Sequence, residues 1–117
     1  MRIHLVNPSH VSFGIGVITP RWLYVLAAAT PREYGDPVIT DETLEFMDPS
    51  IIQRGDVVGI GIHTGNALRG YEVGRAAREA GAWVVEDDYA SEFRYDGPPL
   101  TALQGLDGGQ RVIYVGT

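Results

Sequence analysis

The sequence predicts a three-layer α/β fold in which a parallel sheet of about five strands carries helices on both faces. Short apolar, β-branched runs alternate with helical patterns along the 117-residue chain, as expected for such a fold. Residues 57–62, Val-Val-Gly-Ile-Gly-Ile, show no polar alternation, which is typical of a central parallel strand covered on both faces. The length suits one domain, so residues 1–117 are expected to form a single unit.

The individual elements follow from local patterns. Strands are predicted at residues 2–8, 37–41, 57–62, 82–86 and 111–115. A first helix is expected to begin at Thr19-Pro20, because threonine caps helices well and proline is favoured at the first helical position. A second helix is predicted at residues 67–80, with Gly81 as its C-cap. Its inward-facing residues are expected to be Leu68, Tyr71, Ala76, Ala77 and Ala80. Residues 87–110 show no helical pattern and are predicted to be irregular.

The composition excludes several classes of chemistry. All nine basic residues are arginine, so no Schiff base on lysine and no GK[ST] phosphate loop is available. The absence of cysteine excludes a disulfide, a thiolate nucleophile and an iron–sulfur cluster. A formal net charge of −6 makes general nucleic-acid binding improbable. No signal peptide or membrane span is predicted, and a cytoplasmic location is the default expectation.

Polar or glycine-bearing segments follow the predicted strands, at the edge where ligands of open parallel sheets bind. These segments are residues 8–16, 41–42, 63–66 and 86–89. His10 and His63 lie among them and are candidate hydrogen-bond donors to a ligand, but they lack the spacing of metal ligands, so no metal site is predicted. Residues 86–88, Glu-Asp-Asp, are either a carboxylate cluster for a cation or ring nitrogen, or a solvated turn. The alternative for all four segments is that strand-end loops are polar because they face water.

Residues 59–65 imitate a dinucleotide-binding fingerprint, with Glu86 about 20 residues further on. The glycines fall inside the predicted strand, however, rather than in the turn after it. The alternative is close packing of the following helix on the sheet, which Gly70 and Gly74 favour.

Residues 1–85 resemble the N-terminal cobalamin-binding domain found ahead of radical-SAM enzymes. The segments that carry this resemblance are Leu5–Pro8, Pro20–Ala28, Val38–Glu42 and Asp56–Thr64. It implies a flavodoxin-like, Rossmann-like fold with cobalamin as the cofactor and the corrin ring over the strand ends. The residues implied to line the corrin face are Pro8, Ser9, His10, Phe13, Gly14, Asp41, His63, Thr64, Gly65 and Asn66. The cobalt-coordinating D-x-H-x-x-G motif is absent, and radical-SAM chemistry itself would need cysteines.

Residues 81–117 resemble the fold-type-I aminotransferase domain that GntR-type regulators carry. The matching segments are Gly81–Gly97, Pro99–Leu106 and Arg111–Thr117. In that family the aspartate matching Asp87 pairs with the pyridine nitrogen of pyridoxal phosphate, and the tyrosine matching Tyr89 bonds its phenolic oxygen. The Schiff-base lysine normally follows the segment matching Gly116-Thr117, and this chain has no lysine. The resemblance therefore implies noncovalent pyridoxal phosphate binding at best.

The two resemblances meet within residues 76–86, which predicts a chimera. Residues 1–85 would be the cobalamin-binding-like part, and residues 86–117 an aminotransferase-like segment that supplies the last strand, with residues 83–85 buried. The predicted function is a small-molecule, cobalamin-like binding module without catalysis of its own. The alternatives are a truncated aminotransferase-type fragment without its Schiff-base lysine, and a remnant that binds nothing. Expected partners are a small-molecule cofactor and a second copy or a downstream domain, but neither nucleic acid nor membrane.

Overall fold

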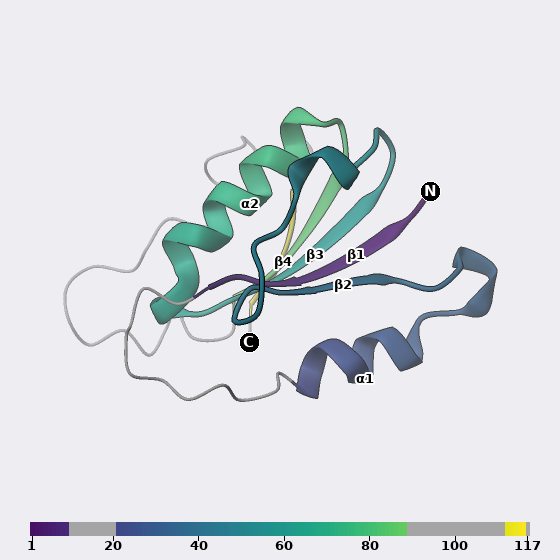
Figure 1. Cartoon of the computed structure of the whole chain (residues 1–117), viewed down its shortest axis with the longest axis horizontal. Helices are drawn as coiled ribbons and strands as arrows, with labels where there is room; N and C mark the ends of the chain where they lie inside the picture. Colours follow the sequence, from purple (N-terminus) through teal and green to yellow (C-terminus); the bar gives the residue numbers. More distant parts are fainter. Residues whose placement is uncertain (10–20, 89–111, 117) are drawn as a thin grey trace.

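The computed structural model describes residues 1–9, 21–88 and 112–116. Its strands and α-helices are, in chain order, β1 (Ile3–Asn7), α1 (Arg21–Ala29), β2 (Val38–Asp41), β3 (Val57–Ile62), α2 (Ala67–Glu79), β4 (Trp83–Asp88) and β5 (Val112–Gly116), shown in Figure 1. Short 3-10 helices lie at η1 (Arg32–Tyr34), η2 (Pro49–Ile51) and η3 (Thr64–Asn66). The predicted α/β class is confirmed.

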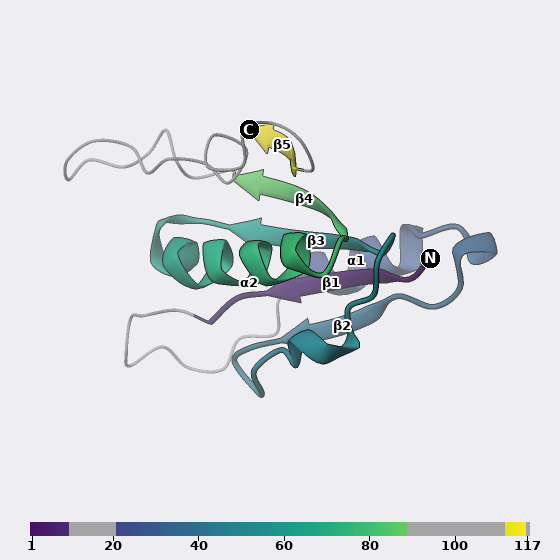
Figure 2. The same cartoon turned by 90° about the horizontal axis from the view of Figure 1, so that it is seen from above.

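The strands form one parallel sheet in the order β2-β1-β3-β4-β5. Figure 2 shows β2 at one edge of this sheet and β5 beside β4 at the other. Because β1 lies between β2 and β3, the chain extends the sheet first to one side of β1 and then to the other. The carboxyl ends of β1 and β3 therefore flank the topological switch point, where ligands of open α/β sheets bind.

Helices α1 and α2 lie on opposite faces of the sheet (Figure 2). Gly61 and Ile62 are neighbours in β3, so their side-chain positions point to opposite faces. A Cβ on Gly61 would lie 2.6 Å from Cζ2 of Trp22 in α1. A Cβ on Gly70 of α2 would lie 2.9 Å from Cγ1 of Ile62. The described elements thus form three layers.

The larger core lies between α2 and the sheet. It is built from buried residues of the strands, of α2 and of the segment before β3, namely Val6, Met47, Ile52, Val58, Ile60, Ile62, Ala67, Tyr71, Val73, Ala77, Ala82 and Val84. Helix α2 ends at Glu79 with Ala80 as its C-cap, and the predicted cap residue Gly81 is the next residue, where its φ of +85° is a conformation that favours glycine. The N–H of Gly81 donates to Arg78 O at 2.9 Å and that of Ala82 to Ala77 O at 3.0 Å, a Schellman arrangement that satisfies the last carbonyls of the helix.

Two sequence predictions about exposure were wrong, and one of the two alternatives for residues 86–88 is excluded. Leu68 is 63% exposed, because it lies one residue off the stripe of α2 that faces the sheet. Trp83 is 45% exposed, because it points to the α1 face while α2 covers its neighbour Val84. Residues 86–88 are not a solvated turn, since β4 continues through Asp88 and Glu86 is fully buried.

Gly59 and Gly61 lie within β3, not in the turn that the dinucleotide fingerprint requires. The packing alternative, in which the following helix packs closely on the sheet, holds for Gly70 of α2, which approaches Ile62. Gly61 instead accommodates the ring of Trp22 in α1, the helix that precedes β3. Residues 89–110 of the segment predicted to be irregular lie outside the described residues. Within the parts of the chain that the structure describes, no helix is long and apolar enough to cross a membrane.

Candidate functional site

One row of residues crosses the sheet near the carboxyl ends of its strands. The strand register pairs Asn7 with Asp41 and Gly61 with Asp87. It also pairs Val6 with Ile60, the residues that precede Asn7 and Gly61. The row therefore runs Asp41, Asn7, Gly61, Asp87 from β2 to β4. Since the position of Gly61 faces Trp22, the whole row lies on the α1 face of the sheet.

A cavity of about 310 Å³ lies over this row. Its described lining residues are Asn7, Trp22, Gly61, His63 and Asp87. The volume falls at the lower end of the range of small-molecule pockets, which runs from about 300 to 1,000 Å³. The lining comes from the carboxyl ends of β1, β3 and β4 and from α1, so the cavity occupies the topological switch point.

The tautomer of His63 follows from its own turn. Its Nδ1 accepts a hydrogen bond from the N–H of Gly65 at 3.1 Å, and its backbone N–H donates to Oδ1 of Asn66 at 2.8 Å. These two bonds form a capping box at the start of η3. A neutral imidazole that accepts at Nδ1 carries its proton on Nε2. The His63 ring in the pocket wall is therefore an Nε2–H donor.

Asp41 orients the amide of Asn7. Its Oδ1 accepts from Nδ2 of Asn7 at 3.1 Å and from the N–H and hydroxyl of Thr43 at 3.1 and 2.9 Å. Because Nδ2 of Asn7 donates to Asp41, the carbonyl oxygen at the other end of the same amide is an acceptor. Asp41 was predicted to line a corrin face, and in the structure it holds the amide of the pocket residue Asn7 in place.

Asn66 ties the ends of β1 and β3 together. The residue is fully buried, and its Nδ2 donates to Gly61 O at 3.1 Å and to Pro8 O at 3.4 Å. Pro8 is buried as well. Both residues were predicted to line a corrin face, but within the described part of the chain they hold the strand ends rather than line the pocket.

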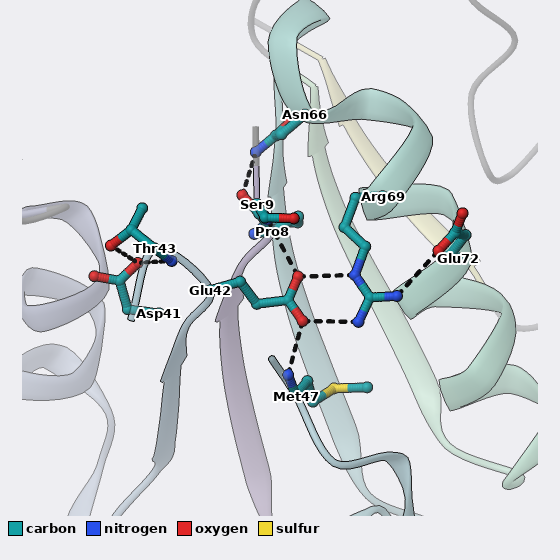
Figure 3. A network of polar contacts seen from close by, with 9 residues as sticks. All are labelled: Pro8, Ser9, Asp41, Glu42, Thr43, Met47, Asn66, Arg69 and Glu72. Carbon is teal, nitrogen blue, oxygen red and sulfur yellow. Dashed lines mark hydrogen bonds and ion pairs between the residues drawn. The ribbon is translucent and has the colours of Figure 1, made fainter. Parts of the chain in front are cut away.

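A buried carboxylate secures the turn after β2, as Figure 3 shows. Oε1 of Glu42 accepts from Ser9 N at 3.1 Å and from Nε of Arg69 at 2.9 Å, and Oε2 accepts from Met47 N at 2.7 Å and from Nη2 of Arg69 at 2.8 Å. Arg69 also pairs with Glu72 at 3.0 Å. Burial raises the pKa of Glu42, but the hydrogen bonds from Arg69, Met47 and Ser9 outweigh it and hold that pKa below its ordinary value.

The network of Glu42 connects the residue after β1 to α2. Ser9, another residue predicted to line a corrin face, contributes its backbone N–H to this network. The network thus fixes the chain where it leaves β1, and its role in the described structure is support.

A second buried pair lies at the opposite edge of the sheet. Nε2 of His4 lies 2.8 Å from Oδ2 of Asp56, and the Asp56 carboxylate also accepts from the N–H groups of Arg2 at 3.0 Å and Gln53 at 2.9 Å. Burial raises the pKa of Asp56, but these hydrogen bonds outweigh it and lower that pKa. The pair joins the amino ends of β1 and β3, so His4 is a structural residue.

Sequence reasoning found part of the site. His63 and Asp87, which came from two separate predictions, line the same pocket. Thr64 and Gly65 lie in η3 beside it. His10, Phe13, Gly14 and Tyr89 lie outside the described residues.

Three pocket residues were not predicted as site residues, namely Asn7, Trp22 and Gly61. Gly61 carried a signal, because a glycine inside a strand often marks a close approach by another group. Asn7 precedes the proline that ends β1, which places it at the correct edge. Trp22 gave no sign of its role, since an aromatic residue in a short helix fits a core equally well.

No family model matches the chain. The curated proteins that share a short similar segment with it include three regulatory proteins. The probable rhizopine catabolism regulatory protein MocR of Rhizobium meliloti is 64% identical over 36 residues, which are 31% of this chain and 7% of that protein. The uncharacterized HTH-type transcriptional regulators YhdI and YdeL of Bacillus subtilis (strain 168) are each 56% identical over 41 residues, which are 35% of this chain and 9% of each regulator.

The chain therefore spans less than a tenth of the length of these relatives and matches them over about a third of its own. A local similarity to regulatory proteins, which is part of the predicted resemblance, is supported. None of the three names refers to cobalamin.

Proposed function

We propose that this chain is a small-molecule binding module without catalysis of its own, whose ligand occupies the pocket over Asn7, Gly61 and Asp87. The observation that carries the proposal is the position of a cavity of about 310 Å³ at the topological switch point. The strand order 2-1-3-4-5 is that of flavodoxin-like folds, which bind ligands at this point. Two of the described lining residues, Asn7 and His63, are held in place by hydrogen bonds to Asp41 and Asn66.

The size of the pocket favours a ligand with a single ring. A cavity of about 310 Å³ is small even for a drug-sized molecule, and a corrin macrocycle does not fit within it. Cobalamin, which the resemblance of residues 1–85 implies, would have to lie outside this cavity, over the strand ends. It is the second candidate ligand and rests on that resemblance alone.

The similarity to regulators supports a pyridine ring as the ligand. We place the matched segment at residues 81–117, a stretch of comparable length that includes β4 and β5. The aspartate that pairs with the pyridine nitrogen in the resembled aminotransferase domains corresponds to Asp87, and Asp87 lines the pocket together with the indole of Trp22. A carboxylate in this place accepts a hydrogen bond from a protonated ring nitrogen.

Pyridoxal phosphate as a whole fits the pocket incompletely. The chain has no lysine to bind it covalently, so no transamination step follows. The described lining residues include no arginine that would hold a phosphate group. The residues present therefore suit the ring and not the rest of the cofactor.

The two tryptophans of the chain provide the test. Trp22 lines the pocket, whereas Trp83 is 45% exposed at the other end of β4. In the Trp83→Phe variant, the indole N–H signal in a ¹H–¹⁵N NMR spectrum belongs to Trp22. We expect pyridoxamine to shift this signal saturably.

The matched control adds Gly61→Ala to the same variant. A Cβ at this position would lie 2.6 Å from the Trp22 ring, so the alanine should displace the ring and remove the response. Pyridoxal phosphate and aquocobalamin complete the panel, and the visible spectrum of aquocobalamin gives an independent readout. If none of the three compounds shifts the Trp22 signal at millimolar concentration, the pocket is not a binding site and the interpretation as a remnant stands.

A further inference from the structure

Helix α1 has the composition of a buried helix, but most of its surface is exposed. Arg21 is its one charged residue, and the remaining residues are aliphatic or aromatic. Leu23 is its one buried residue, whereas Val25 is 62% exposed and Leu26 is 47% exposed. A helix that is apolar all round is normally covered on more than one side, so a second surface is expected to pack on α1.

The exposed residues continue a stripe that begins at the pocket. Side chains at i, i+3, i+4 and i+7 lie on one side of a helix. In α1 these positions, which we call the α1 stripe, hold Trp22, Val25, Leu26 and Ala29. The ring of Trp22 packs over Gly61 of β3, so the stripe lies on the flank of α1 that points from β1 across β3 towards β4.

The sheet beside this flank is also apolar. Val85 of β4 pairs with Ile113 of β5, and both lie on the α1 face because Asp87, two residues after Val85, lies there. Val85 is half-buried and Ile113 is 52% exposed. Figure 2 shows α1 behind β1 and β3, on the side of the sheet opposite to α2. Among the described elements, no helix covers β4 and β5 on the α1 face.

The spacing of the strands suits one more helix at this position. Neighbouring strands are about 4.8 Å apart, so β4 lies about 10 Å from β1 across β3. The axes of packed helices are about 8–10 Å apart. A helix packed against the α1 stripe would therefore lie over β4 and cover Val85 and Ile113. Helix α1 of a second copy is such a helix, since it has an uncovered apolar flank of its own.

A two-fold axis parallel to the strands would satisfy both copies at once. It places the two α1 helices side by side and parallel, stripe against stripe, between the two sheets. Each α1 then packs on β1 and β3 of its own copy and on β4 and β5 of the other. Such a contact is isologous, because the same surface of each copy is buried.

The charges at the end of this contact are complementary. Arg21 lies two residues before Leu23, so the two side chains lie on nearly opposite sides of α1. Because Leu23 is buried, Arg21 points away from the sheet of its own copy. The ring of the adjacent Trp22 packs at Gly61, in the same row as Asp87. The axis brings the same ends of both sheets together, which places Arg21 of one copy near the exposed Asp87 of the other.

We propose that a second copy of this chain docks on the α1 face, with the two α1 stripes in contact and each α1 over β4 and β5 of the other copy. The proposal does not depend on a ligand in the pocket. A helix of nine residues is only about 14 Å long, so the contact falls at the small end of specific interfaces. We therefore expect a dissociation constant in the micromolar range.

Sedimentation equilibrium of the full chain, from low to high micromolar concentration, tests for the dimer. The mass should rise with concentration towards twice the 12.7 kDa of the chain. Leu26→Glu places a charge in the stripe, and we expect it to raise the dissociation constant at least about tenfold, because an unpaired charge would be buried. Tyr24→Glu is the matched control. Tyr24 is 48% exposed on the opposite flank of α1, and this variant should change the constant by no more than about twofold.

Single cysteines report the direction of the axis, because the chain has no cysteine of its own. Ala29 lies at the end of the stripe, where parallel helices bring the two equivalent positions together and antiparallel helices keep them apart. A disulfide requires Cα atoms within about 7 Å. We expect Ala29→Cys to form a cross-linked dimer under mild oxidation. Ala28→Cys, at an exposed position outside the stripe, should not form one.

Each contrary result overturns the proposal. A chain that stays monomeric at all concentrations shows that something other than a second copy covers this face. Equal effects of Leu26→Glu and Tyr24→Glu place the contact elsewhere, and a dimer without the Ala29→Cys cross-link excludes the parallel arrangement. Circular dichroism establishes that each variant is folded, and the mass of the unchanged chain requires no variant. None of these outcomes bears on ligand binding in the pocket, so the proposed function is tested separately.

Discussion

Replacing Arg69 by methionine tests the hydrogen-bond network of Glu42. The substitution removes the guanidinium that donates two hydrogen bonds to Glu42, at 2.9 and 2.8 Å. The Glu42 side chain is completely buried, so water cannot replace these two hydrogen bonds without a rearrangement of the turn. Methionine retains the aliphatic contact of the arginine stem, which keeps the loss of packing small.

The expected loss of stability follows from the interactions that Arg69 and Glu42 lose. A hydrogen bond to a charged group contributes about 1.5–3 kcal/mol, and removal of one partner of a buried ion pair costs about 3–5 kcal/mol. Two backbone N–H donors to Glu42 remain, and the Arg69 side chain is 25% exposed, so part of the interaction is already shared with water. We therefore expect a loss of about 2–4 kcal/mol in the free energy of unfolding, or roughly 10 °C in Tm.

Urea unfolding followed by far-UV circular dichroism measures this loss. Arg75→Met is the matched control, because Arg75 is an exposed arginine on the same helix, and it should change the free energy by no more than about 0.5 kcal/mol. Arg69→Lys should fall between the two, since lysine keeps the charge without the bidentate geometry. If Arg69→Met is as stable as Arg75→Met, the buried carboxylate does not depend on its arginine and the reasoning is wrong.

Three further predictions concern the sheet and the pocket. Gly61→Ala should cost about 1–3 kcal/mol and change the emission of Trp22, because the new methyl group meets its ring; unchanged fluorescence in the Trp83→Phe background would contradict the packing described. Asn66→Ala should cost about 1–3 kcal/mol in urea unfolding, because the carbonyls and the N–H that it pairs are left unsatisfied. Asp56→Asn tests how the stability of the chain depends on pH. Since the pKa of Asp56 is lower in the folded chain than its ordinary value of 3.8, its stabilisation is complete above that value and is lost as the pH falls through the folded pKa. The variant should therefore be less stable than the wild type at neutral pH, and it should lose less stability as the pH falls below about 4. If the urea midpoints of the two proteins change with pH by the same amount, this prediction is wrong.

The fold was largely predictable because its signals are local. The apolar run at residues 57–62, the helical spacing of residues 67–80 and the glycine at position 81 each reflect nearby backbone and burial constraints. The structure has a strand at Val57–Ile62, a helix at Ala67–Glu79 and a positive φ at Gly81. The exposure of Leu68 and Trp83 was not predictable, since it depends on where a helix lies over the sheet. Both residues are apolar, and apolar character alone does not determine which face of an element is covered.

Only the location of the site, at the sheet edge where the strands end, was predictable from the sequence. Strand ends indicated where polar residues gather, and His63 and Asp87 were found in this way. Which of these residues face a cavity depends on the register between strands that are distant in sequence. Asp41 and Asn7 are an example, because it is the register of β1 and β2 that places the carboxylate of Asp41 where it supports the amide of Asn7.

The described lining of the pocket comes from two separate stretches of the chain. Asn7, Trp22, Gly61 and His63 precede residue 64, whereas Asp87 comes from β4. The carboxylate among the described lining residues is therefore encoded apart from the other four. A substitution at position 87 alters the charge of this lining and leaves the residues of the first stretch as they are.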